Sequence, residues 1–210
     1  MNITGLLDRQ LQTSGIGPTF GQMQEYGCWC YLGSEHGKGR GSPQDEFDNN
    51  CQSLHHGLTC VEMDIPTCQP ASGKKYNVVV NVDSNGDQSI DCETLNVGDD
   101  CAEAVCYLES YFATNFLELV LTQFITPNMP KYKVAAGFDN SVCMQGTPPR
   151  QGDFTEFCCG EYPANTRKPI KVHGGEDREC CTKENGRFNV FNPNLNECCD
   201  GGQVEAVGAC

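Results

Sequence analysis

The fold is decided by Tyr26-Gly27-Cys28-Trp29-Cys30-Tyr31-Leu32-Gly33 and by two stretches C-terminal to it: Gly41-Ser42-Pro43, and then Asp48-Asn49-Asn50-Cys51-Gln52-Ser53-Leu54-His55-His56. Ser42 before Pro43 is a helix start, because a capping residue precedes a proline and the acids Asp45 and Glu46 come next in the first turn. We expect this helix to run to about His56 or beyond. A glycine- and cysteine-rich loop therefore leads into a helix that carries a cysteine and two adjacent histidines.

Other segments also have the periodicity of regular structure. Residues 2–12 carry apolar side chains at the spacing of a short amphipathic helix, and residues 99–124 do so over a wide face. Residues 76–82 and 89–92 are typical of strands, and Asn85-Gly86 between them is a strong hairpin signal. Two long helices and a small hairpin predict an α+β fold.

Composition indicates a secreted, extracellular protein. Sixteen of the 210 residues are cysteine, a density typical of disulfide scaffolds, because cytosolic reductants would keep such thiols reduced. Only Leu6-Leu7 is an apolar pair near the start, so we expect a mature chain with no signal-peptide core and no transmembrane segment. The net charge of -14 argues against nucleic acid as a partner. It favours cations such as calcium or a mineral surface, although the same charge also keeps a protein soluble.

The cysteines divide evenly along the chain. Eight lie in 28–106 and eight in 143–210, and even counts permit two self-contained disulfide domains. The run Thr126-Pro127-Asn128-Met129-Pro130 interrupts an apolar helical pattern and marks a junction. We therefore predict one domain over residues 1–125, a junction over 126–142 and a small turn-rich disulfide domain over 143–210.

Residues 26–56 resemble the calcium loop and first catalytic helix of the secreted phospholipase A2 family, and the likeness extends over about residues 2–124. Family members carry Cys-Cys-x-x-His-Asp-x-Cys-Tyr on that helix. With Cys51 as the second cysteine, Leu54 takes the place of the catalytic histidine and His55 that of the calcium-binding aspartate. On the second long helix, Glu109 takes the place of the aspartate that orients the histidine. The resemblance thus implies phospholipase A2-like helices with a degenerate site.

The same register places four other residues on cysteine positions that form two disulfides between the helices of the family: Asn50 with Asn115, and Gly57 with Leu108. Both members of each pair are lost together, as a workable chain requires, because a lone partner would be a free thiol. We expect Leu54 and Leu108 to pack across the helix interface instead. By resemblance, the remaining cysteines imply Cys30–Cys51, Cys68–Cys101 and Cys92–Cys106. Cys28 and Cys60 then pair either with each other or with the second domain.

The chemistry that the resemblance implies needs a base and a calcium ion, and both are altered here. Leucine cannot accept a proton, and the imidazole of His55 is a poor ligand for a cation that prefers oxygen. Tyr31 stands where a glycine lets the loop wrap the ion. We therefore expect no catalytic, cofactor-binding or metal-binding residue and no enzyme activity. The alternative is a calcium-dependent phospholipase A2 in which a helical bulge lets His55 act as the base.

The segment from Asp83 to Asp91 has the alternating oxygens of a calcium-binding EF-hand loop. The glycine, however, falls at the fourth loop position instead of the sixth, and Thr94 replaces the bidentate glutamate. The hairpin interpretation is favoured, and weak calcium binding at its tip stays open.

Residues 143–210 contain cysteine doublets at intervals of about twenty residues: Cys158-Cys159, Cys180-Cys181 and Cys198-Cys199, flanked by Cys143 and Cys210. Neighbouring half-cystines in extended chain point to opposite sides, so each doublet can bond two different neighbours. The pattern resembles the dicysteine repeats of galaxin-type matrix proteins of coral skeletons. Zinc is disfavoured because no Cys-x2-Cys occurs.

These features are compatible with three function classes. The first is a secreted, catalytically inactive structural or interaction component of extracellular matrix, associated with a protein partner or with mineral, and it explains the degenerate site, the acidity and the doublets together. The second is a non-catalytic, toxin-like protein that binds lipid or a partner. The third is the active phospholipase.

Overall fold

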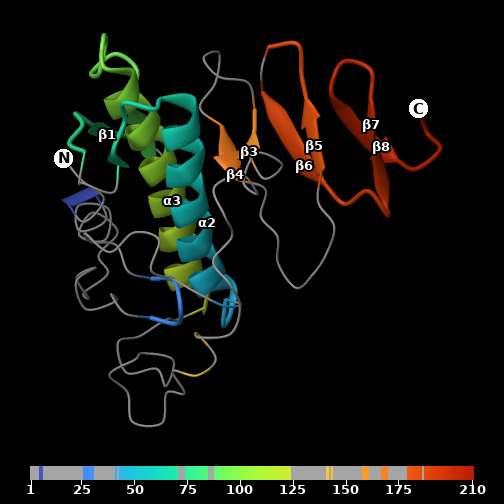
Figure 1. Cartoon of the computed structure of the whole chain (residues 1–210), viewed down its shortest axis with the longest axis horizontal. Helices are drawn as coiled ribbons and strands as arrows, with labels where there is room; N and C mark the ends of the chain where they lie inside the picture. Colours follow the sequence, from blue (N-terminus) through green and yellow to red (C-terminus); the bar gives the residue numbers. More distant parts are fainter. Residues whose placement is uncertain are drawn as a thin grey trace.

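The computed structural model describes residues 5–6, 26–30, 41, 43–70, 74–84, 88–123, 141, 143, 158–160, 167–169, 179–185 and 187–210. Two long helices, α2 (Glu46–Asp64) and α3 (Asp100–Gln123), lie side by side and run in opposite directions (Figure 1). A row of small hairpins extends outward from α2 (Figure 1). The predicted disulfide-rich α+β fold is confirmed in this general form.

Carboxylates at the start of each helix cap its free N–H groups. The Asp45 side chain accepts a hydrogen bond from the Asp48 N–H at 3.0 Å, so Asp45 is the N-cap of α2. The Asp99 side chain does the same for the Ala102 N–H at 3.0 Å at the start of α3. The helix predicted after Ser42-Pro43 thus begins at Glu46 and continues eight residues beyond His56, to Asp64.

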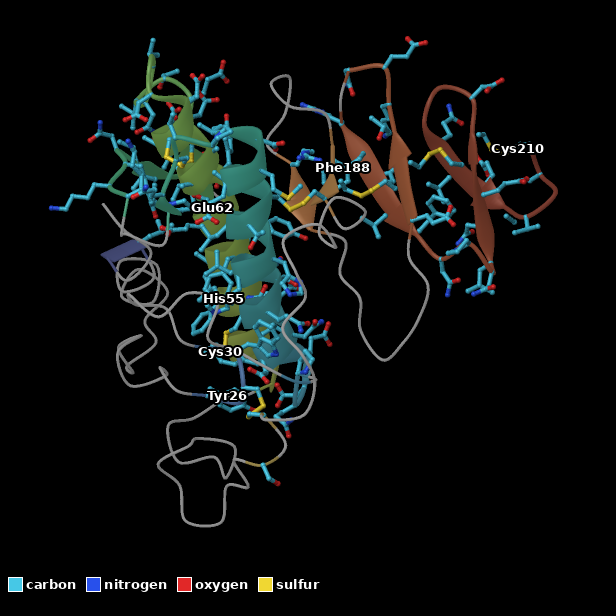
Figure 2. The ribbon with its side chains drawn as sticks, viewed as in Figure 1. Tyr26, Cys30, His55, Glu62, Phe188 and Cys210 are labelled. Carbon is cyan, nitrogen blue, oxygen red and sulfur yellow. A yellow bond between two sulfur atoms is a disulfide. The ribbon has the colours of Figure 1, made fainter. Side chains whose placement is uncertain are left out.

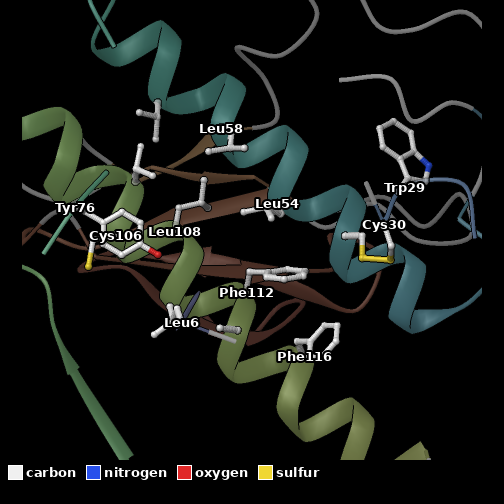
Figure 3. Close-up of a cluster of buried hydrophobic side chains, with 14 of the residues drawn as sticks. Leu6, Trp29, Cys30, Leu54, Leu58, Tyr76, Cys106, Leu108, Phe112 and Phe116 are labelled. Atoms are coloured by element: carbon white, nitrogen blue, oxygen red, sulfur yellow. A yellow bond between two sulfur atoms is a disulfide. The ribbon is translucent and has the colours of Figure 1, made fainter. Parts of the chain in front are cut away.

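The core lies between the two helices (Figure 3). Leu54 and Leu108 are 1% and 2% exposed and belong to it, as the sequence predicts. Gly57 makes the closest approach, because a Cβ at this position would lie 2.3 Å from the Leu108 Cδ1. Leu108 therefore fills the space over a residue that has no side chain. Asn50 donates from Nδ2 to the Phe112 carbonyl at 3.2 Å, which adds a polar contact across the same interface.

Strands β1 (Val79–Val82) and β2 (Gln88–Asp91) form an antiparallel hairpin in which Val82 is opposite Gln88. The predicted hairpin is confirmed, and its turn at Asn85-Gly86 lies outside the described residues. The Asp91 carboxylate accepts the Thr94 N–H at 3.0 Å and also the Thr94 hydroxyl. Asp91, a candidate calcium ligand in the EF-hand interpretation, therefore closes the turn after the hairpin.

The C-terminal hairpins are three antiparallel pairs of short strands. Strand β3 (Cys158–Cys159) pairs with β4 (Lys168–Pro169), β5 (Glu179–Thr182) with β6 (Phe188–Phe191), and β7 (Asn196–Cys199) with β8 (Gln203–Ala206). The cysteine doublets are in β3, β5 and β7, the first strand of each hairpin. In extended backbone, neighbouring side chains point to opposite sides of a strand.

Disulfides connect these hairpins in series. Cys159 bonds Cys180, Cys181 bonds Cys198, and Cys199 bonds Cys210. Each doublet thus uses its first cysteine for the preceding element and its second for the next one. We call the three linked hairpins the disulfide ladder (residues 158–210).

Within the helical part, Cys30 bonds Cys51, Cys68 bonds Cys101 and Cys92 bonds Cys106, the three pairs that the resemblance implies. Two further disulfides, Cys28–Cys143 and Cys60–Cys158, cross between the two halves of the chain. Of the two alternatives that the sequence left open for Cys28 and Cys60, the structure therefore has the second, bonds to the C-terminal half. An even number of cysteines in each half is also found when two disulfides cross between the halves. The count alone therefore cannot distinguish crossing disulfides from self-contained domains.

The ladder is attached to α2 by a second contact beside Cys60–Cys158. The Arg167 Nε donates to both carboxylate oxygens of Asp64, at 2.8 and 2.9 Å, and its Nη2 also donates to Asp64. A bidentate pair of this kind fixes orientation as well as distance. The last turn of α2 and the strand pair β3–β4 are therefore held together by one covalent and one ionic contact.

Several predictions fall outside the described residues. These are the helix over 2–12 apart from residues 5 and 6, the junction over 126–142 apart from residue 141, and Tyr31. Of the helices in the described part of the chain, none combines the length and the apolar character that crossing a bilayer requires.

Candidate functional site

Residues 26–30 form a tight loop that closes on the first half of α2. The Cys30 N–H donates to the Tyr26 carbonyl at 3.3 Å, and Cys30 is bonded to Cys51 on the helix. Figure 2 shows Tyr26, Cys30 and His55 along this part of α2. The loop and helix that the sequence singled out are thus brought together.

Asp48 is the anchor of this loop. Its buried carboxylate accepts N–H groups from Cys28 at 2.9 Å, Trp29 at 2.7 Å and Gln44 at 2.9 Å. Burial raises the pKa of Asp48 to about 6, against the opposing effect of these three donors. Gly27 makes the close approach feasible, because it has a φ of 58° and a Cβ there would lie 2.3 Å from the Asp48 Cγ.

His55 points at the same loop from about two turns further along the helix. Its Nε2 lies 2.7 Å from the Trp29 carbonyl oxygen, and the residue is only 4% exposed. A carbonyl oxygen can only accept, so Nε2 carries the proton and donates it. The indole of Trp29 lies beside both histidines, with ring centroids 5.9 Å from His55 and 5.4 Å from His56. The Nε2 of His55 is thus committed to the loop as a donor.

Leu54 and Glu109 have other environments. Leu54 lies between the helices with Leu58 and Phe112, among apolar side chains (Figure 3). Glu109 is 5% exposed and accepts the Tyr76 hydroxyl at 2.6 Å. Burial, and after it the negative charge of Glu109, raises the pKa of Tyr76 far above its ordinary value, so Tyr76 stays a hydrogen-bond donor.

The three residues of the predicted degenerate site therefore have three separate structural roles. Leu54 packs in the core, His55 holds the loop and Glu109 binds Tyr76. Sequence analysis assigned no role to Asp48, Gly27 or Tyr76. The available sequence signal for the Asp48 contact was a glycine in a cysteine-rich loop, together with an acid in the first turn of the next helix.

The described residues contain no group of three or more His, Cys, Asp or Glu side chains that could hold a metal ion. All sixteen cysteines are in disulfides, so none is available as a zinc thiolate. The chain matches none of the protein-family models and none of the curated proteins with which its sequence was compared.

His56, the neighbour of His55, provides a pH-dependent contribution to stability. Burial lowers its pKa from 6.5 to about 4. The unfolded chain therefore binds a proton below pH 6.5 that the folded chain does not bind until about pH 4. Relative to His56→Gln, the wild type should lose up to about 3 kcal/mol of unfolding free energy between pH 7 and pH 4.

Chemical denaturation of both proteins at pH 7, 5.5 and 4, with disulfides intact, measures this difference. Protonation of Asp48 acts in the opposite direction, since its pKa is raised, but it is common to both proteins and cancels. A stability difference that stays constant over this range would contradict the assignment.

Proposed function

We propose that this chain is a secreted, non-catalytic protein, built on a degenerate phospholipase A2-like scaffold, that acts as a structural or interaction component of extracellular matrix. The observation that carries the proposal is the hydrogen bond from the His55 Nε2 to the Trp29 carbonyl at 2.7 Å. This hydrogen bond supports the interpretation that the protein's own side chains, and not a bound cation, hold the loop.

In the family that the sequence resembles, the loop carbonyls and the aspartate at the position of His55 hold calcium. Here the imidazole N–H contacts a loop carbonyl directly, and a cation would compete with it for the same electron pairs. The Asp48 carboxylate satisfies the loop N–H groups from the other side. The loop thus has hydrogen-bond partners within the protein, and the residue at the position of the calcium-binding aspartate is a donor.

Catalysis would further need a base that faces Glu109, the acid on the second long helix. Leu54, at the position of the base, has no acceptor, and its burial in the helix interface supports a packing role. The His55 Nε2 donates to the Trp29 carbonyl, and Glu109 accepts the Tyr76 hydroxyl, so the imidazole and the acid each have a hydrogen-bond partner elsewhere. These two features favour the inactive alternative over a phospholipase that uses His55.

The disulfide ladder supports the structural part of the proposal. A continuous series of disulfides runs from Cys60 on α2 through the three hairpins of the disulfide ladder to Cys210. Such a series resists extension and unfolding with little apolar core, because each bridge restricts the unfolded chain. The net charge of -14 favours a cationic partner such as a calcium mineral.

We expect no hydrolysis of phospholipid micelles above the blank at millimolar calcium, no difference between wild type and His55→Ala in this assay, and no shift of the thermal midpoint when calcium is exchanged for a chelator. In parallel, the protein should pellet with calcium carbonate particles and not with phosphatidylcholine vesicles. Calcium-dependent hydrolysis that His55→Ala abolishes would refute the inactive assignment. Pelleting with the vesicles alone would favour the lipid-binding class over the matrix class.

A further inference from the structure

The eight disulfides differ sharply in exposure. Each of seven has at least one buried cysteine, whereas in Cys199–Cys210 neither residue is buried and Cys210 is exposed. Figure 2 places Cys210 at the outer end of the row of hairpins, away from α2. Since all sixteen cysteines lie in the described part of the chain, the comparison covers every disulfide of this sequence.

The partial exposure of Cys199 and the greater exposure of Cys210 matter because thiol–disulfide exchange has two requirements. A thiolate must reach one sulfur, and the other sulfur must leave as a thiolate that water can solvate. Cys198 is also exposed, but an attack on it would expel Cys181, which is 0% exposed, and a desolvated thiolate is unfavourable. In Cys199–Cys210, attack on Cys199 expels Cys210 into solvent.

Opening this disulfide also disturbs the fold least. It closes a loop with a sequence separation of 11, the shortest of the eight. The segment after β8 also has contacts besides the disulfide, because the Glu197 Oε1 accepts the N–H groups of Gly208 at 2.7 Å and Cys210 at 3.0 Å. The paired strands β7 and β8 and the inner disulfide Cys181–Cys198 are likewise unaffected.

We propose that Cys199–Cys210 is a thiol-exchangeable disulfide through which two copies of this chain become covalently joined, Cys199 of each copy to Cys210 of the other. The partner is a second copy because reciprocal exchange uses both released sulfurs and leaves no free thiol. A small thiol or an unrelated protein thiol would leave one sulfur of the pair reduced. The inference stands on the exposure of Cys199 and Cys210 relative to the other cysteine pairs and is independent of the matrix role proposed above.

The exchange balances without an oxidant. The thiolate of a glutathione-class thiol attacks the Cys199 Sγ, a mixed disulfide forms, and Cys210 leaves as a thiolate. This thiolate attacks the Cys199 Sγ of a second copy and releases the Cys210 thiolate of that copy. The released thiolate then attacks the mixed disulfide on the first copy and returns the small thiol. Two disulfides are present before and after, and the thiol is a catalyst.

Isotope mixing tests the proposal. Equal amounts of unlabelled and 15N-labelled protein are incubated with catalytic reduced glutathione, quenched by alkylation and digested without reduction. Cleavage after acidic residues separates 206–210 from the segment that carries Cys198 and Cys199. We expect disulfide-linked peptides of mixed isotope for Cys199–Cys210, rising with protein concentration toward one half, and a disulfide-linked dimer on a non-reducing gel.

The controls decide between outcomes. The Cys199→Ser/Cys210→Ser double variant, which has no unpaired thiol, should stay folded and form no dimer. The other disulfides serve as internal controls and should show no mixing. Absence of mixed peptides at every protein concentration would overturn the proposal. So would glutathione bound at Cys199 without any dimer, or mixing that occurs equally at the other pairs.

Discussion

Replacing Asp48 with asparagine will lower the free energy of unfolding by about 3 kcal/mol, because one buried carboxylate accepts three backbone N–H groups of the loop and helix start. Asparagine keeps one acceptor oxygen, but its second terminal atom is an amide nitrogen. This nitrogen is itself a donor and would face the backbone N–H groups that the carboxylate now accepts. At least one buried N–H then has no acceptor. Chemical denaturation with disulfides intact measures the loss, and Trp29, the single tryptophan, reports on the loop through its fluorescence.

Asp91→Asn is the matched control. Asp91 also accepts a backbone N–H, from Thr94 at 3.0 Å, but its carboxylate is exposed, so water replaces what the substitution removes. We expect this variant to unfold close to the wild type and to leave the Trp29 emission unchanged. If both variants lost the same stability, the Asp48 contacts would not be the anchor of the loop.

The second large effect is expected where Gly57 meets Leu108. Leu108→Ala should cost about 2–5 kcal/mol, since it leaves a cavity in the helix interface. Gly57→Ala should cost about 1–3 kcal/mol through overlap with the Leu108 methyl groups, although alanine is the better helix former. The new methyl group occupies part of the space that Leu108→Ala vacates. The double variant should therefore be more stable than the sum of the single losses predicts.

A double-mutant cycle from denaturation midpoints gives this coupling, which we expect to be about 1–3 kcal/mol in favour of the pair. Phe116→Ala combined with Gly57→Ala is the control, because Phe116 is also buried in the core but the three nearest atoms to a Cβ at Gly57 all belong to Leu108. Additive losses in the first cycle would show that Gly57 and Leu108 are not in contact.

Local structure was largely predictable from the residues. The proline and acids after Ser42 predicted the start of α2 to within a few residues, and Asn85-Gly86 between two strand-like runs predicted the hairpin. The doublets predicted that each pair of neighbouring cysteines bonds two different elements, and the ladder does this in β3, β5 and β7. These features depend on backbone preferences and side-chain alternation over a few residues.

The sequence predicted which residues belong to the candidate site, but not the contacts that these residues make. Leu54, His55 and Glu109 were recognised, but the Trp29 carbonyl and the Tyr76 hydroxyl were not predicted as their contacts. A backbone carbonyl has no sequence signature, and Tyr76 is separated from Glu109 by the hairpin and a loop. The role of Asp48 was missed for the same reason, because its partners are main-chain N–H groups.

By itself the sequence determined the elements, the spacing of the cysteines and the absence of a base at residue 54, because these depend on residue identity and on neighbours within a few positions. Only the tertiary structure decided that Cys28 and Cys60 reach across sequence separations of 115 and 98 to join the two halves. It also decided that the His55 Nε2 donates to the loop. Pairing over such separations depends on where packed helices place each group, and cysteine parity and helical periodicity are compatible with several such placements.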